Sequence, residues 1–347
     1  MEPQNLPGGK FRHGREPSRR RLMAKPILLV TRKLPEAIEA RAAQDYDARL
    51  NPKDALWATD GAEIARRATE ASAAGILGAA GDRFDSVCIN ALPPSTKIIA
   101  TFSVGFDHID IAAANARGIV VTNTPEVLSF ATAECAFTLM LMAARRAGEG
   151  ERMVRAGKWK GWAPTQLLGV TLERKKLGIL GFGRIGRELA SIARGFRMEI
   201  HYRDLDRLPP ELEQGASYHD NDEDFLRTID VLSMHVPGRE GTRKWLNAGR
   251  LATMKRGAIV VNTARGALVD DEALIAGLKS GHIRAAGLDV YDGEPKVNPG
   301  YLTLENVTLL PHLGSATIET RDAMGHRALE NLDAVLLKGT AAPDRVA

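Results

Sequence analysis

A glycine-rich turn constrains the fold of this 347-residue chain more than any other feature. Gly181, Gly183 and Gly186 directly follow the apolar run 177–180 and open the helix expected over 184–194. In such a unit the first glycine permits a tight turn, the second lets a pyrophosphate approach the backbone, and the third lets helix and strand pack closely. The helix N-terminus offers free N–H groups to the phosphates. The motif therefore predicts a dinucleotide site, with Arg184 and Ile185 as further candidate contacts.

The end of the next expected strand bears on which dinucleotide binds. Asp204 stands eighteen residues after Gly186, where an acidic residue hydrogen-bonds the adenosine ribose and repels a 2′-phosphate. Arg203 and Arg207 flank it and would attract a 2′-phosphate. The sequence favours NAD and leaves NADP open.

Apolar strands and helices alternate along the whole chain, which is the pattern of βαβ units. Such alternation predicts parallel sheets with helices on both faces. We expect an α/β fold with two Rossmann-like or flavodoxin-like domains and a cleft between them. The expected strands are 26–30, 74–77, 97–101 and 118–121 in a first series, and 177–180, 199–202, 231–235, 258–262, 285–290 and 307–310 in a second. The expected helices include 35–45, 109–117, 125–146, 184–194, 271–280 and 317–338.

The long helix expected over 125–146 separates the two series. We therefore expect a dinucleotide-binding Rossmann domain over 126–314 and a smaller, substrate-binding domain that begins with 26–125. The final helix follows the last strand of the larger domain and is expected to cross back. Residues 315–347 are accordingly assigned to the smaller domain.

Positive charge is concentrated at the start of the chain. Residues 1–25 hold seven Lys or Arg and two Glu, a net charge of +5, whereas the whole chain carries +4. The rest is therefore near neutral, which argues against a nucleic-acid partner. Pro and Gly without apolar periodicity predict a disordered basic tail over 1–25. Met23 is an alternative start, and an anionic partner for the tail is the lesser alternative.

Other features bear on location and partners. The longest apolar run, 131–144, is interrupted by Glu134 and is too short to span a bilayer, so no membrane partner is expected. Cys88 and Cys135 have the spacing of neither a disulfide framework nor a metal site. We expect a cytoplasmic protein without a metal.

Three polar residues, Arg265, Glu294 and His312, follow three successive strands of the larger domain. Ligands of open parallel sheets bind outside the carboxyl ends of the strands, so these side chains should meet beside the dinucleotide. Arg265 can hold a substrate carboxylate and carbonyl oxygen, and His312 can supply a proton near neutral pH. Glu294 can hold the other ring nitrogen. Each residue alone has an equally good structural explanation; together they predict reduction of a small 2-oxo acid.

These residues lie in segments that resemble the D-2-hydroxyacid dehydrogenase family. The resemblance extends from about residue 26 to the C-terminus, and GWAPTQLLG (161–169) looks most like the glyoxylate/hydroxypyruvate reductases. The other segments are FSVGFDHIDI (102–111), GILGFGRIG (178–186), VVNTARGALVDDEAL (260–274), GLDVYDGEP (287–295) and LLPHLGSATIETR (309–321).

The resemblance implies roles for particular residues. It implies an Arg265–Glu294–His312 triad with His312 as acid/base, and substrate carboxylate binding by backbone N–H groups near Val104 and Gly105. It also implies a homodimer whose contact runs through 125–170. The remaining implied cofactor contacts are Val236, Pro237, Thr242, Thr263, Ala264, Gly314, the triad's Arg265 and His312, and Asp289 at the nicotinamide amide.

Two alternative functions stay open. Another enzyme of the family, acting on D-lactate or D-3-phosphoglycerate, would share the fold and the triad. The segments 102–107 and 162–166 lack the extra cations that a phosphate would need, and Glu294 argues against formate dehydrogenase. The NADP-using reductases that the chain resembles place a neutral or basic residue where this chain has Asp204, which argues against a preference for NADPH. A dinucleotide-sensing protein similar to the superfamily's corepressors is the alternative outside enzymes.

Overall fold

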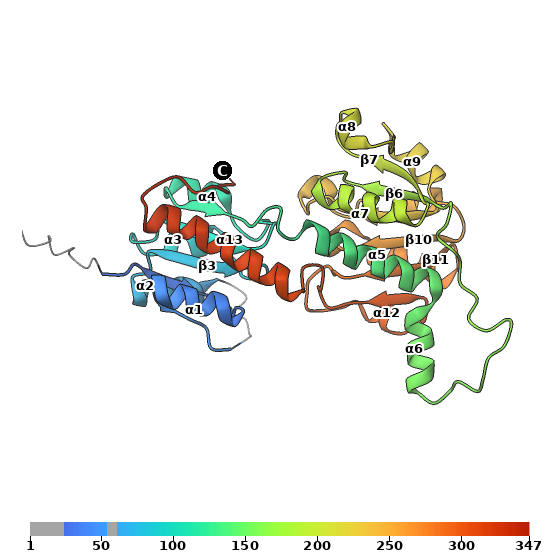
Figure 1. Cartoon of the computed structure of the whole chain (residues 1–347), viewed down its shortest axis with the longest axis horizontal. Helices are drawn as coiled ribbons and strands as arrows, with labels where there is room; N and C mark the ends of the chain where they lie inside the picture. The colour runs from blue at the N-terminus through green and yellow to red at the C-terminus, as the bar shows by residue number, and fades with distance from the viewer. Residues whose placement is uncertain (1–23, 54–60, 347) are drawn as a thin grey trace, which may run out of the picture.

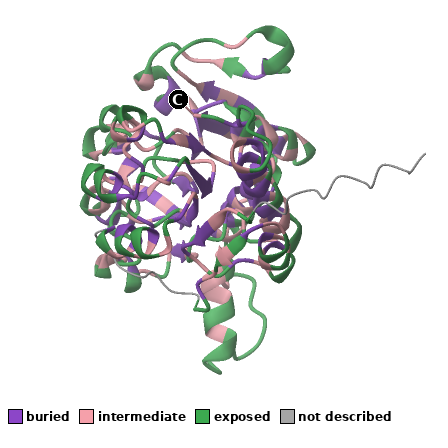
Figure 2. Cartoon of the chain, turned by 90° about the vertical axis from the view of Figure 1, so that its left-hand side faces the viewer, coloured by how far each residue is buried: buried purple, intermediate pink, exposed green. Residues whose placement is uncertain are grey.

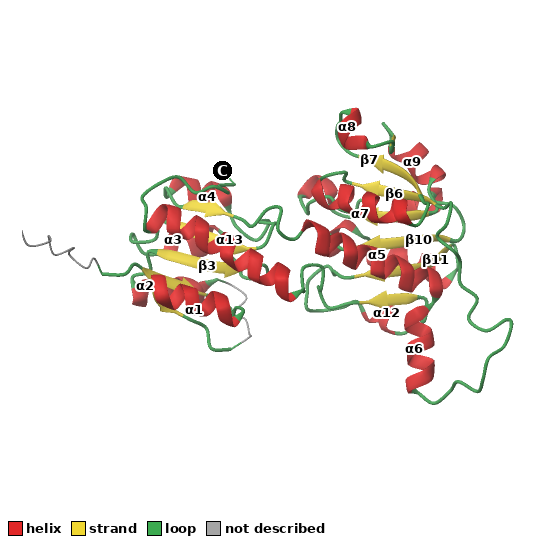
Figure 3. Cartoon of the chain, viewed as in Figure 1, coloured by secondary structure: helices red, strands yellow, loops and turns green. Residues whose placement is uncertain are grey.

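The computed structural model describes residues 24–53 and 61–346, and these form two α/β lobes joined end to end (Figure 1). Each lobe contains one parallel sheet between layers of helices (Figure 3), which confirms the predicted fold class. The predicted basic tail lies outside the described residues apart from Ala24 and Lys25. Within the described ranges, no helix is both long enough and apolar enough to cross a membrane.

The first sheet has the strand order β2-β1-β3-β4-β5, which is the flavodoxin-like order. Side chains alternate between its faces: Leu28 and Val30 pack under α1 and α13, whereas Leu29 packs against α2 and α3. The strands are β1 (Ile27–Val30), β2 (Asp47–Arg49), β3 (Gly75–Ala79), β4 (Ile98–Phe102) and β5 (Val120–Thr122). The helices are α1 (Glu36–Asp45), α2 (Ala62–Ala71), α3 (Ser86–Ala91), α4 (Ile111–Ala116) and the last helix of the chain, α13 (Ile318–Leu336).

The second sheet has the order β12-β11-β10-β9-β6-β7-β8, and its direction of winding reverses between β6 and β9, as in a Rossmann fold. The strands are β6 (Lys176–Leu180), β7 (Glu199–Arg203), β8 (Ser217–Tyr218), β9 (Val231–Met234), β10 (Ala258–Asn262), β11 (Ile283–Leu288) and β12 (Val307–Leu309). On one face lie α5 (Ser129–Arg145) and α7 (Arg184–Gly195); further helices are α8 (Pro210–Glu213), α9 (Asp222–Thr228), α10 (Ala248–Thr253), α11 (Asp271–Lys279) and α12 (Pro299–Leu302). Two 3-10 turns cover Glu240–Thr242 and Gly266–Leu268.

An arm projects from the second lobe, made of α6 (Ala147–Arg155) and the loop over 156–170 (Figure 1). No residue of α6 is buried, and the arm is mostly exposed at the foot of the molecule (Figure 2). Helix α6 therefore adds nothing to the core of its own lobe, and in the loop Val170 packs against that core.

Several expected boundaries differ from the structure. The helix expected over 125–146 begins at Ser129, because Glu126 has a φ of 73°, which an α-helix cannot contain. The strand expected over 285–290 runs from Ile283 to Leu288, because Leu288 pairs with Asn262, the last residue of β10. The edge strands β2 and β8 were not expected, since three and two residues carry no readable apolar pattern.

Gly325 should be required where α13 packs on α1 of the first lobe. A Cβ at this position would overlap the buried side chain of Ile38 near its root, so Gly325→Ala should lower the free energy of unfolding by about 1–3 kcal/mol. Gly195→Ala is the matched control, because a Cβ there meets nothing within 4 Å and should gain up to about 1 kcal/mol of helix propensity. Chemical denaturation measures both; equal stabilisation would show that α13 does not pack tightly on α1.

Candidate active site

A cavity of about 1180 Å³ lies between the two lobes. Val104 and Gly105 of the first lobe line it, together with Arg265, Glu294 and His312 of the second. All these residues follow the carboxyl ends of parallel strands, which is where ligands of such sheets bind. The three residues predicted from separate strand ends are therefore brought to one cleft.

The glycine turn lies between β6 and the N-terminus of α7. Gly181 has a φ of 88°, and a Cβ there would come within 2.8 Å of Val236. A Cβ on Gly183 would meet nothing within 4 Å, so the side of the turn that a pyrophosphate would approach is open. No side chain caps the first turn of α7, and its N–H groups remain available to phosphate oxygens. Ile185 lines the cavity, whereas Arg184 is exposed and lies 3.5 Å from Glu126.

The carboxylate of Asp204 sits beside this turn. It accepts hydrogen bonds from the N–H groups of Phe182 and Leu205, both at 2.7 Å. The two neighbouring arginines are engaged elsewhere: Arg203 Nε bonds Asp222 at 3.1 Å, and Arg207 Nε bonds the buried Glu213 at 2.9 Å. The anionic group at the end of β7 is thus held next to the glycine turn.

Three buried polar atoms of residues that line the cavity lack a partner among the described residues. They are Nδ1 of His235, the hydroxyl of Thr263 and Nε of Arg32. Burial lowers the pKa of His235 to about 4, so its imidazole is neutral at physiological pH. Unsatisfied polar groups of this kind are costly and fit a wall that a polar ligand completes. The residues present therefore suit a dinucleotide.

Other predicted cofactor residues divide into two groups. Val236, Pro237, Ala264 and Gly314 line the cavity. Thr242 does not line it; its hydroxyl donates to the carbonyl oxygen of Pro237 at 2.8 Å and shapes the wall from behind.

His312 and Glu294 form a hydrogen-bonded pair, with 2.8 Å between Nδ1 and Oε2. Burial alone would raise the pKa of Glu294, but the hydrogen bond and charge of His312, the Tyr291 N–H and the charge of Arg265 outweigh it and hold this pKa below its ordinary value. Glu294 is therefore an anion at neutral pH. The pair leaves Nε2 of His312 for a substrate.

Asp289 holds the backbone that carries His312. His312 has a φ of 58°, a conformation that costs a non-glycine residue free energy. The Asp289 carbonyl accepts from the His312 N–H at 2.9 Å, and its carboxylate accepts from the N–H groups of Leu313 and Gly314 at 2.7 and 2.8 Å. The side chain is fully buried, and burial raises its pKa against these bonds. Its predicted contact with the nicotinamide stays a prediction.

Arg265 is fixed by the turn that follows β10. The buried Asn262 accepts from the Ala264 N–H at 3.0 Å and donates to the Arg265 carbonyl at 2.8 Å. The Arg265 guanidinium reaches the first lobe, where Nη2 lies 2.8 Å from Oδ1 of Asp107. Asp107 was not expected in the site; its single signal is that it stands as an acid two residues after Gly105.

The backbone at Val104 and Gly105 is arranged to bind an anion. Their carbonyls accept from the side chains of Asn123 at 2.8 Å and Ser103 at 2.6 Å. Their N–H groups make no hydrogen bond in the described parts of the chain. The predicted substrate contact at these N–H groups is compatible with this geometry.

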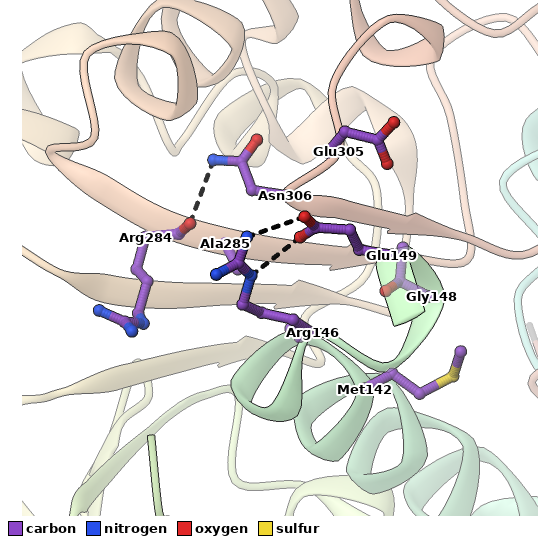
Figure 4. Close-up of a pocket in the computed structure, with 10 residues that line it drawn as sticks. Met142, Arg146, Gly148, Glu149, Arg284, Ala285, Glu305 and Asn306 are labelled. Carbon is purple, nitrogen blue, oxygen red and sulfur yellow. Dashed lines mark hydrogen bonds and ion pairs between the residues drawn. The ribbon is translucent and has the colours of Figure 1, made fainter. Parts of the chain in front are cut away.

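A second cavity, of about 250 Å³, lies at the amino ends of β11 and β12 (Figure 4). Arg146 and Glu149 form two hydrogen bonds of 2.8 Å across it, and Asn306 donates to the Arg284 carbonyl at 3.1 Å. Its other charged groups have partners outside it: Glu305 pairs with Arg152, and Arg284 donates to the Leu168 carbonyl. This cavity lies at the edge of the sheet opposite the cleft. The interlobe cleft is therefore the candidate active site.

Known proteins resemble the chain over nearly its full length. A profile of the family described as D-isomer specific 2-hydroxyacid dehydrogenase, NAD binding domain, matches residues 137–314. The glycerate dehydrogenase of Hyphomicrobium methylovorum is 42% identical over 90% of this chain and 97% of that protein. The glyoxylate reductase of Thermococcus litoralis is 43% identical over 93% of this chain and 97% of that protein.

Solved structures agree. A glyoxylate reductase from Paecilomyes thermophila superimposes with a TM-score of 0.83 at 35% identity, covering 93% of this chain and 99% of that one. The NADPH-dependent glyoxylate/hydroxypyruvate reductase of Sinorhizobium meliloti, in complex with NADP and malonate, has a TM-score of 0.81 at 32% identity, covering 93% and 97%. The chain therefore belongs to the D-isomer specific 2-hydroxyacid dehydrogenase family, close to its glyoxylate reductases, and is an NAD(P)-dependent oxidoreductase.

Proposed function

We propose that the protein reduces glyoxylate or hydroxypyruvate to the 2-hydroxy acid, with NADH as the favoured cofactor. One observation carries the proposal: the His312–Glu294 pair and Arg265 converge on the cleft that also contains the glycine turn. In this proposal residues 26–125 and 315–347 bind the substrate, and residues 126–314 bind the cofactor.

The geometry supports His312 as a proton donor and Arg265 as the residue that binds the anionic substrate. Reduced nicotinamide, when bound, supplies the hydride that C2 of the substrate receives. Nε2 of His312 donates a proton to the carbonyl oxygen, while Glu294 stabilises the imidazolium through Nδ1. Arg265 and the N–H groups of Val104 and Gly105 bind the substrate carboxylate and carbonyl oxygen. His312 is left neutral and regains a proton from water.

The end of β7 supports NAD over NADP. Asp204 presents a negative charge where a 2′-phosphate would lie, and Arg203 and Arg207 already pair with carboxylates. The relatives named above act on glyoxylate, hydroxypyruvate or glycerate, and glycerate is the reduction product of hydroxypyruvate.

The apolar surface of the arm supports a homodimer. Val154, Trp159, Trp162 and Leu168 are each more than half exposed, at 60, 54, 82 and 58%. Large apolar side chains gathered on one projecting segment mark an interaction surface. We propose that a second copy of the chain covers them.

The principal experiment follows NADH and NADPH oxidation separately with glyoxylate, hydroxypyruvate and pyruvate, and NAD⁺ reduction with formate as a negative control. We expect the highest kcat/KM with NADH and glyoxylate or hydroxypyruvate. His312→Asn should lower kcat at least about 100-fold, because it removes the general acid, and should leave the NADH dissociation constant unchanged. Retained turnover in His312→Asn, or no turnover with any 2-oxo acid, would refute the proposal.

Glu294→Gln tests the orienting carboxylate. Reduction needs the imidazolium of His312 as proton donor, and the carboxylate of Glu294 stabilises that charged form through Nδ1. A neutral amide does not, so kcat/KM should fall about 10-fold or more, while the NADH dissociation constant stays unchanged. Glu240→Gln is the control, because Glu240 lines the adjoining cavity with Glu294 without a hydrogen bond to His312. An unchanged kcat/KM in Glu294→Gln would remove Glu294 from the chemistry.

Trp162→Glu tests the dimer. Sedimentation velocity should give twice the 37.6 kDa chain mass for the wild type. Loss of a buried tryptophan anchor costs about 2 kcal/mol or more, so the dimer dissociation constant should rise at least about 30-fold. Val87→Glu, 73% exposed on α3, should leave it unchanged. A monomeric wild type would contradict the assignment.

A further inference from the structure

Asp107 and Arg265 form an ion pair that joins the two lobes across the cleft. Asp107 follows β4 of the first sheet, and Arg265 follows β10 of the second. Oδ1 of Asp107 lies 2.8 Å from Nη2 and 3.1 Å from Nε, and Oδ2 lies 3.2 Å from Nε. The carboxylate thus grips one side of the guanidinium.

The remaining donors of Arg265 can be counted. A guanidinium has five N–H groups. Asp107 takes one on Nε and one on Nη2, and the Ala264 carbonyl accepts one from Nη1 at 2.7 Å. One N–H on Nη1 and one on Nη2 remain, which is the pair that a second carboxylate or a carbonyl oxygen can use.

Close packing fixes the guanidinium where those donors are useful. A Cβ on Gly105 would overlap Nη2 of Arg265, and a Cβ on Gly238 would come within 2.9 Å of its Cγ. The arginine is therefore clamped between one glycine from each lobe. Nη2, which carries one of the remaining donors, lies beside Gly105, and the N–H groups of Val104 and Gly105 make no hydrogen bond in the described parts of the chain.

We propose that Asp107 is a positioning residue: it orients the guanidinium of Arg265 toward the substrate. Because Asp107 and Arg265 belong to different lobes, this orientation requires that the two lobes lie close together. This inference rests on the proposed function, in which Arg265 binds the 2-oxo acid. Burial opposes ionisation of Asp107, but the hydrogen bond and charge of Arg265 outweigh it and lower its pKa.

The pair contributes little to stability as such. The side chains of Arg265 and Asp107 are 29% and 43% exposed, and ion pairs at such exposed positions add little to the free energy of unfolding. An effect of Asp107 on catalysis can therefore be measured without loss of the fold.

The test is Asp107→Asn in the full-length protein, with kinetics, melting temperature, NADH affinity, and binding of oxamate, a 2-oxo acid analogue, to the NADH complex. We expect kcat/KM to fall about 10–100-fold and oxamate binding to weaken, because a misaimed guanidinium loses its two-point contact. NADH affinity and melting temperature should stay unchanged. Asp292→Asn is the matched control: Asp292 pairs with Arg243 at 2.8 Å in the adjoining cavity and does not touch Arg265.

A double variant separates positioning from an independent role. Arg265→Lys keeps the charge but loses the fork, so adding Asp107→Asn to it should cost less than about twofold in kcat/KM. A full additional loss would show that Asp107 acts without Arg265. Unchanged kcat/KM in Asp107→Asn would reduce the pair to a structural contact.

Tighter oxamate binding in Asp107→Asn would overturn the proposal in a different way. It would mean that the substrate must displace Asp107 from Arg265, so that Asp107 is a competing anion. The oxamate measurement needs no turnover. A wild type that binds oxamate but reduces no 2-oxo acid would refute the proposed function, and oxamate binding to Asp107→Asn would still test the role of Asp107.

Discussion

The parallel direction of the strands in both sheets is the constraint on which the rest of the structure depends. Every connection between parallel neighbours must cross over a face of the sheet, so the carboxyl ends of all strands in a lobe meet at one edge. The two lobes are joined so that both edges contribute to one cleft. Arg265, Glu294 and His312 follow three different strands, and the parallel direction of those strands brings all three to the same edge.

Buried polar groups at these strand ends serve two purposes. Asn262 and Asp289 are fully buried, and each side chain makes two hydrogen bonds to backbone groups, which fix the turns that carry Arg265 and His312. Their bonds are strengthened by the low local dielectric, so the turns are rigid. His235 and Thr263 also line the cavity, and Nδ1 of the first and the hydroxyl of the second are buried without partners among the described residues. The hydrogen-bonded groups hold the shape of the site, and the groups without partners are the ones that fit a polar ligand.

Sequence patterns predicted the features that recur along the chain, such as alternating strands and helices, and the features with a fixed local geometry, such as the glycine turn. The apolar strands of both sheets are four to six residues long in most cases and flanked by helices, so their order along the chain predicted the fold class. The glycine turn and the triad followed from position relative to those strands. The edge strands β2 and β8 were missed because they are short and half-exposed. The start of α5 was misplaced because a positive φ at Glu126 leaves no sequence signature.

Asp107 illustrates a limit of a different kind. Its partner is 158 residues away on the other lobe, and nothing local in FSVGFDHIDI indicates that its carboxylate faces an arginine. Both arginines at the end of β7 are also paired with carboxylates, so pairing alone does not distinguish Arg265 from Arg203 or Arg207. What distinguishes Arg265 is that it lines the cleft with two N–H groups not taken by its partners, and that its Nη2 lies beside Gly105. An arginine is available to a substrate according to the donors that its partners leave, and that count can be made only when the lobes are seen together.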